Sequence, residues 1–192
     1  MPPRRERYHH GDLRAALIDV AVELLAEQGV HGFSMAEASR RLGVAQAAPY
    51  RHFADRDELL AAVAVRAAEL LAVRLAEAGS SGTPAQRLAA ASGAYVRFTV
   101  DERPLFQALF DSGLDKSRYP DVEAAGLRLH AAFLAPALEL CGDEERAARL
   151  ASAVVAAAHG YAVLGLEGAK DGVAMAMAAA RALVLGREAL TG

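Results

Sequence analysis

The stretch SMAEASRRLGVAQAAPYRHF, residues 34–53, decides how the N-terminal part of the chain folds. Ser34 and Glu37 form the capping-box pattern, in which each side chain accepts a hydrogen bond from the other residue's amide, so a helix should begin here. Gly43 interrupts that helix and permits a tight turn. A very short helical segment, about residues 46–52, is expected to follow. The spacing therefore predicts helix, turn, helix.

A helix-turn-helix of this shape has two interpretations. In one, the second helix is presented to the major groove of DNA, and Val44 fills the angle between the two helices. In the other, the stretch is an ordinary corner between two packed helices, which many helical proteins contain. The spacing alone leaves both open.

Helices are also expected on both sides of this stretch. Leu13, Leu17, Val20 and Leu24 recur at helical spacing, and Gly29 ends that segment. Asp55 is placed to cap a long helix that runs to about Ala78. Further helices are predicted at about 84–101, 103–111, 120–140, 143–167 and 171–190, separated by proline and glycine.

These elements give an all-α fold, because no segment shows the length and alternation of a strand. Residues 79–82, GSSG, form the clearest linker in the chain. We expect an N-terminal helix-turn-helix domain over residues 8–55, a connecting helix over 56–79, and a C-terminal helical domain over 84–190.

The composition agrees with helices and excludes several classes of protein. The 192 residues include 46 alanines and no tryptophan, and 54% are hydrophobic, which excludes a disordered tail. The one cysteine, Cys141, excludes a disulfide scaffold and suits a reducing cytoplasm. The formal net charge of −3 gives little support for DNA binding, although an average can hide a segregated surface.

Sequence features of an enzyme are missing. There is no G-x-S-x-G motif and no phosphate-binding glycine loop after a strand, and Cys141 has no patterned histidine nearby. The histidines lack metal-ligand spacing, so we expect neither a metal nor a cofactor. Residues 150–166 carry no formal charge, but their many alanines and glycines favour a packed helix over a membrane span.

Residues 43–60, GVAQAAPYRHFADRDELL, resemble the turn and recognition helix of the tetracycline-repressor (TetR) family, roughly G-V-S-x-x-x-x-Y-x-H-F. Residues 8–14, YHHGDLR, are similar to the opening of one branch of these repressors. Residues 156–161, AAAHGY, are similar to the His-Gly core of a C-terminal domain in that branch, although the usual preceding tryptophan is missing. The resemblance implies a cytoplasmic transcriptional regulator, by default a repressor, that binds a palindromic operator.

The chemistry of the side chains suggests which residues contact DNA. Tyr50 and His52 can donate to phosphate oxygens, and Arg56 lies in the first turn of a helix, where anions bind. Tyr50 could instead belong partly to the core, whereas Phe53 is expected to be an apolar wedge between the short helices and the long one.

Base contacts should come from the first half of the short helix. Gln46 can pair with adenine, and Ala45 or Ala47 can touch a thymine methyl. Arg51 suits a guanine edge or a phosphate, and Ser34 can add a hydroxyl contact.

Two residues depart from the family pattern, so the operator sequence cannot be carried over. Ala45 replaces the usual Ser or Thr cap, and Pro49 lies inside the recognition segment. Arg4, Arg5 and Arg7 form a basic arm that could follow a groove of the DNA or simply be solvated.

The C-terminal domain is expected to bind a small-molecule effector and a second copy of the chain. Its aromatic and histidine side chains could line a cavity or fill a plain core, and the candidates are Phe98, Phe106, Phe110, His130, Phe133 and His159. The last two helices are rich in small residues, which suits close packing in a homodimer. The alternative function is a helical interaction protein whose DNA motif no longer works.

Overall fold

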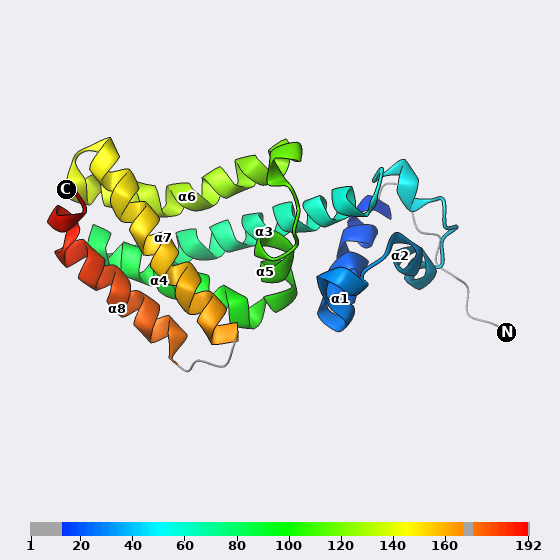
Figure 1. The fold of residues 1–192 in the computed structure, drawn as a ribbon, viewed down its shortest axis with the longest axis horizontal. Helices are drawn as coiled ribbons and strands as arrows, with labels where there is room; N and C mark the ends of the chain where they lie inside the picture. The colour runs from blue at the N-terminus through cyan, green and yellow to red at the C-terminus, as the bar shows by residue number, and fades with distance from the viewer. Residues whose placement is uncertain (1–12, 167–170, 192) are drawn as a thin grey trace.

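The computed structural model describes residues 13–166 and 171–191, and all regular structure within them is helical, as predicted. One end of the elongated molecule consists of α1 (Leu13–Gly32), α2 (Met35–Leu42) and the single 3-10 turn η1 (Pro49–Arg51) (Figure 1). From this end α3 (Arg56–Ala78) runs into the body of the molecule. The long helix therefore joins the two parts of the chain.

The body is a bundle around α4 (Pro84–Asp101). The other elements of the bundle are α5 (Arg103–Phe110), η2 (Lys116–Arg118), α6 (Pro120–Cys141), α7 (Glu144–Leu166), α8 (Gly172–Leu185) and η3 (Arg187–Thr191). α4 packs against α3, α6, α7 and α8, while α1 packs against α3 and α5. Buried apolar residues from α1 through α8 form one continuous core. The N-terminal end is therefore packed against the bundle and is not joined to it by a linker alone.

The helix starts follow the capping residues. The Asp55 carboxylate accepts a hydrogen bond from the Glu58 amide at 2.8 Å, and Thr83 and Gln86 make both bonds of a capping box. The Ser34 hydroxyl accepts from the Glu37 amide at 3.2 Å. The second half of that predicted capping box is not formed, because the Glu37 carboxylate binds arginines instead.

The largest difference from the prediction is the segment at 46–52, which is not an α-helix. Residues 46–48 form a turn, and only Pro49–Arg51 are helical, in a 3-10 turn. Pro49 has no amide proton to donate to the carbonyl of Ala45, and Ala45 has no side-chain oxygen to cap a helix. The carbonyl of Ala45 accepts instead from the Ala48 amide at 2.9 Å.

Two other helix ends differ slightly from the prediction. Gly29 breaks the regular geometry of α1 with φ 69° and ψ 176°, and the chain resumes a helical turn that reaches Gly32. The last predicted helix, 171–190, divides at Gly186 into α8 and η3.

Among the described residues two helices are long and apolar enough to cross a membrane, Pro120–Cys141 and Glu144–Gly165. Length and composition are weak grounds for a span, because core helices of water-soluble proteins share both properties. Here the two helices pack against each other and against α4.

Candidate functional site

The turn between α2 and the following segment depends on Gly43. Its φ of 65° is in the left-handed region that glycine enters without strain, and its amide donates to the carbonyl of Arg40 at 3.2 Å. The Val44 amide donates to the carbonyl of Ser39 at 3.1 Å, which completes a Schellman-type ending. These bonds fix the direction in which the chain leaves α2.

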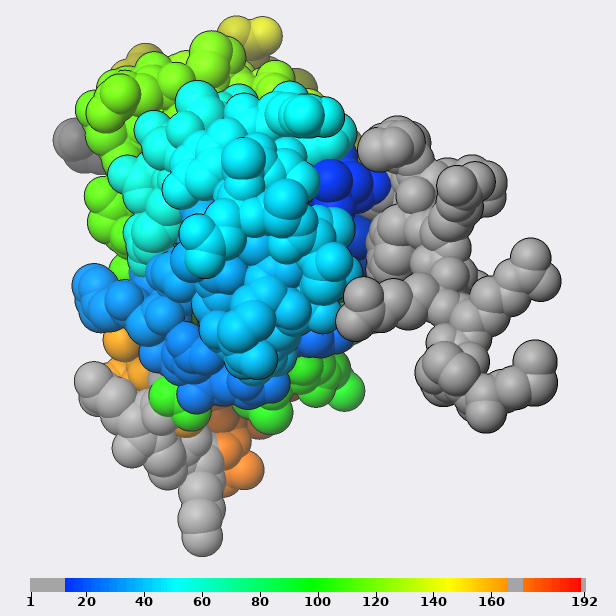
Figure 2. Space-filling model, turned by 90° about the vertical axis from the view of Figure 1, so that its right-hand side faces the viewer, coloured from blue at the N-terminus to red at the C-terminus, as the bar shows by residue number. Residues whose placement is uncertain are grey.

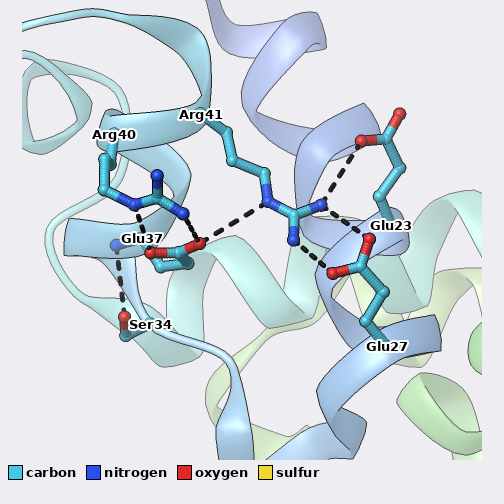
Figure 3. A network of polar contacts seen from close by, with 6 residues as sticks. All are labelled: Glu23, Glu27, Ser34, Glu37, Arg40 and Arg41. Carbon is cyan, nitrogen blue, oxygen red and sulfur yellow. Dashed lines mark hydrogen bonds and ion pairs between the residues drawn. The ribbon is translucent and has the colours of Figure 1, made fainter.

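An arginine-carboxylate network holds α2 against α1 (Figure 3). Arg41 donates to the carboxylate of Glu27 and lies 3.8 Å from Glu23 and 3.6 Å from Glu37. Arg40 binds the Glu37 carboxylate with two hydrogen bonds, of 2.8 and 2.6 Å. The hydrogen bonds from arginine lower the pKa of both Glu27 and Glu37. The two helices are therefore clamped by charge as well as by apolar packing.

The segment after the turn, residues 45–53, is anchored by two buried side chains and presents its polar ones to solvent. Pro49 is buried and Phe53 is 1% exposed, whereas Tyr50 is 57% exposed. Gln46 and Arg51 are also exposed, as are Ala45 and Ala47. This recognition segment, as we call it, lies at the end of the molecule that faces the viewer in Figure 2.

Three further residues predicted to contact DNA, Arg51, His52 and Ser34, differ in their hydrogen-bond and ion-pair partners. Arg51 has no acidic partner among the residues that the structure describes, although most other arginines near this end do. His52 is half-buried at the end of η1, where its amide donates to the carbonyl of Pro49 at 2.9 Å. Ser34 is exposed at the start of α2, with its hydroxyl already used as a cap.

Arg56, which is expected from the sequence to contact a phosphate, makes several hydrogen bonds within the protein. Its guanidinium donates to the carbonyl of Phe33 at 3.0 Å and to that of Val30, and it lies over the Phe33 ring. A further bond of 3.1 Å joins it to Asp57. Through these hydrogen bonds, Arg56 connects the start of α3 to the segment between α1 and α2.

The C-terminal bundle contains an apolar cavity of about 210 Å³ between α4, α5, η2, α6 and α7. Its lining residues are Tyr95, Leu109, Phe110, Lys116, Val122, Gly126, Leu129, His130, Phe133 and Val155. Three of the six predicted ligand residues, Phe110, His130 and Phe133, are in this set. A small cavity therefore exists where the sequence left open either a cavity or a filled core.

The other three predicted ligand residues do not line the cavity. Phe98 and Phe106 are fully buried in the core. His159 belongs to an aromatic cluster behind the cavity wall, where its Nδ1 lies 3.0 Å from the Tyr95 hydroxyl and its ring stacks on Phe106. Burial raises the pKa of Tyr95, so that the phenol stays neutral.

Sequence reasoning missed several lining residues. Lys116 is one of only two lysines, beside nineteen arginines, and Gly126 interrupts an apolar helix; both facts were visible in the sequence. Neither residue could be placed at the cavity without knowing how η2 and α6 pack.

A larger groove of about 740 Å³ separates the N-terminal end from the bundle. α1 and α3 form one side, and Arg118, Tyr119 and the first turn of α6 form the other. Val122 lines both this interdomain groove and the cavity. The short segment from Lys116 to Val122 thus contacts the two spaces at once.

An unpartnered apolar face covers the outer side of α7 and α8. Both helices pack on α4 and on each other, which leaves their opposite sides exposed. The exposed residues include Ser152, Ala156, Gly160, Val163 and Leu164 on α7, and Ala174, Met175, Ala178, Ala182 and Leu185 on α8, with the exposed charges of Arg149 and Arg181 beside them. We call this surface the α7–α8 face.

Two further features concern the N-terminal arm and the grouping of possible metal ligands. The basic arm with Arg4, Arg5 and Arg7, and the segment at 8–12, lie outside the described residues. Among the residues that are described, no three His, Cys, Asp or Glu side chains come together as a metal site.

Comparison with known proteins identifies the N-terminal part. Residues 17–63 match the model of the family described as bacterial regulatory proteins, tetR family. The match spans α1, α2, the recognition segment and the start of α3. A search of curated proteins finds no match.

Solved structures resemble the whole chain. A protein of unknown function from Rhodococcus sp. RHA1 is 30% identical, with a TM-score of 0.81 over 95% of this chain and 98% of its own. A tetR-family transcriptional regulator from Streptomyces coelicolor is 24% identical, with a TM-score of 0.72 over 95% and 82%. The TetR family transcriptional regulator PfmR from Thermus thermophilus is 22% identical, with a TM-score of 0.63 over 88% and 97%. With its matching helix-turn-helix and its helical C-terminal domain, this chain belongs to the tetR family of bacterial regulatory proteins.

Proposed function

We propose that the protein is a transcriptional repressor that binds a palindromic operator as a homodimer and releases it when a small molecule enters the C-terminal cavity. Membership of a family of DNA-binding regulators supports the first part and disfavours an enzyme. The observation that carries the proposal is the recognition segment, which is anchored by the buried side chains of Pro49 and Phe53 while Gln46, Tyr50 and Arg51 are exposed. Such a regulator acts in the cytoplasm, where it meets DNA.

The exposed residues are assigned by their chemistry. Tyr50, Arg51 and His52 contact phosphates, and Arg51 can also reach a guanine edge. The base-reading positions are Gln46, for adenine, and Ala45 and Ala47, for thymine methyl groups. Ser34 adds a hydroxyl contact at the start of α2. Arg56 positions the α1–α2 connection, and its contribution to phosphate binding is indirect.

Dimerisation through the α7–α8 face follows from the size of the recognition segment. One 3-10 turn makes too few contacts for specific binding, so two copies must reach successive major grooves, about 34 Å apart. Most exposed residues of the face are small or apolar, and the exposed arginines on it are Arg149 of α7 and Arg181 of α8. Small side chains let helices from two protomers approach closely, as a symmetric interface needs.

Release is explained by the segment from Lys116 to Val122. Lys116 lies at the cavity and Tyr119 lies in the interdomain groove, near the carboxylates of Asp55, Asp57 and Glu58 at the start of α3. A ligand that moves this segment changes the packing of α3 and so the distance between the two recognition segments. The ligand must bind one arrangement better than the other, since otherwise the equilibrium does not shift.

Selection of duplexes from a random DNA library, followed by fluorescence anisotropy across salt concentrations, tests the proposal. A palindrome should be enriched. Arg51→Met should lower the affinity about tenfold and reduce the slope of log affinity against log salt by about one. Tyr50→Phe should cause a smaller loss, because a single phosphate hydrogen bond is removed.

Arg97→Met is the matched control, because Arg97 is exposed on α4 in the bundle and the charge change is the same. Its affinity should equal that of the unmodified protein. If no duplex is enriched, and Arg51→Met binds DNA as well as Arg97→Met, the protein is instead a helical interaction protein.

A further inference from the structure

The cavity is small and almost wholly apolar. Its walls come from leucine, valine and phenylalanine side chains with the ring of Tyr95, and its volume is about 210 Å³. A cavity of about 150 Å³ lined by apolar side chains accommodates benzene, so this one has room for a ring with a short substituent, about ten heavy atoms. An apolar body of this size would displace water that the walls cannot bind.

The one formal charge in the lining is the ammonium of Lys116. It lies 5.2 Å from the centre of the Phe110 ring, and it makes no ion pair within the described residues. Desolvation lowers the pKa of Lys116, and the nearby charge of Asp111 opposes that effect. Lys116 is thus a cation at the edge of an apolar space whose strongest contact is an aromatic ring.

Two other polar side chains, Tyr95 and His130, line the cavity. The Tyr95 hydroxyl is bonded to His159, and His130 is half-buried on α6. No Asp or Glu is among the lining residues. Asp111 acts on Lys116 from outside the lining, so within the cavity a ligand cation would meet the ammonium without a carboxylate, whereas a ligand anion would find a partner.

We infer that the cavity binds a compact apolar carboxylate, with the hydrocarbon body against Phe110, Phe133 and Leu129 and the carboxylate against the Lys116 ammonium. This inference rests on the proposed function, because it names the chemical class of the effector. Lys116 is on η2, next to the residues that line the interdomain groove, so the ion pair would form at the segment through which release is transmitted.

Three probes of similar size and different charge test the assignment: phenylacetate, 2-phenylacetamide and phenethylamine. Isothermal titration calorimetry with the full-length protein gives the affinity for each. Phenylacetate should bind about tenfold more tightly than the amide, because a charge-assisted pair is stronger than a neutral hydrogen bond. Phenethylamine should bind most weakly.

Two variants connect the binding to the cavity. Lys116→Met keeps the length of the side chain and removes its charge, so phenylacetate and the amide should bind it about equally. At Gly126 an added Cβ would meet no atom within 4 Å, so Gly126→Leu should fold and fill the cavity, abolishing binding of all three probes. Ala131→Leu, at an exposed position of α6 outside the lining, is the control and should bind as the unmodified protein does.

Three results would each overturn the inference: no binding of phenylacetate, an amide or amine that binds as tightly as the carboxylate, or unchanged binding in Gly126→Leu. The anisotropy assay with the selected duplex, repeated at saturating phenylacetate, separates this inference from the proposed function. If the carboxylate binds as described and the DNA affinity does not change, the cavity assignment stands and the release mechanism fails.

Discussion

Arg56 shows how one side chain can serve a DNA-binding surface without belonging to it. Its guanidinium bridges the carbonyls of Val30 and Phe33, which belong to the connection between α1 and α2. These carbonyls follow the break at Gly29 and have no regular helical partners of their own. Arg56 matches a phosphate contact in the family pattern, and in this structure its side chain stabilises the fold of the N-terminal end.

We predict that Arg56→Met lowers the free energy of unfolding by roughly 1 kcal/mol, because two hydrogen bonds from a charged donor are lost at a partly exposed site. Urea denaturation measures the change. Arg66→Met, which removes an exposed ion pair with Asp19, is the comparison and should cost less. Unchanged stability together with weaker DNA binding would place the Arg56 guanidinium on a phosphate after all.

At the scale of elements, the clamp between α1 and α2 depends on ionised carboxylates. The pKa values of Glu27 and Glu37 are lowered in the folded protein, so both groups bind fewer protons there than in the unfolded chain. Their contribution to stability is present above the ordinary carboxyl pKa, about 4.3, and is lost as the pH falls through the lower folded values.

Arg41→Met should therefore destabilise the protein at pH 7, and the difference from the unmodified protein should shrink as the pH falls from about 5 to about 3. Thermal unfolding followed by circular dichroism at a series of pH values gives the comparison. Arg149→Met removes a pair between exposed neighbours on α7 and should have little effect at any pH. A destabilisation by Arg41→Met that persists unchanged at pH 3 would show that the clamp does not act through these carboxylates.

The helix starts were easier to predict from the sequence than the segment at 46–52 or the cavity. The starts of α2, α3 and α4 were predictable because Ser34, Asp55 and Thr83 satisfy amides only a few residues away. The short helical segment predicted at 46–52 is confirmed only over Pro49–Arg51, as a 3-10 turn, because Pro49 has no amide proton to donate to the carbonyl of Ala45. The cavity could be predicted only in part, since Phe110 and Phe133 are expected near a pocket, whereas the position of Lys116 depends on how η2 packs.

At the scale of the whole molecule, the proposed homodimer places the α7–α8 face between two protomers, so that two recognition segments can act together. We predict that Ala156→Glu converts the dimer to a monomer, because a buried unpaired carboxylate would be placed in the interface. Light scattering after size-exclusion chromatography measures the mass. The affinity for the operator should fall by at least about tenfold, since the second half-site is no longer presented at high effective concentration.

The matched control is Ala131→Glu, which adds the same charge at an exposed position of α6. This variant should remain dimeric and bind the operator normally. Because Ala156 is exposed in the single protomer, Ala156→Glu should not affect folding of the chain. A protein that stays dimeric with this substitution would move the interface to another surface.

In the recognition segment, the side chains that anchor it to the core are different from those that are exposed to solvent. Pro49 and Phe53 anchor the segment with buried side chains, while Gln46, Ala47 and Arg51 are exposed. Substitutions at these exposed positions should therefore change the free energy of unfolding only slightly, typically by less than about 0.5 kcal/mol. If these positions read bases as proposed, substitutions there could retarget the regulator to new promoters while the scaffold that carries them stays the same.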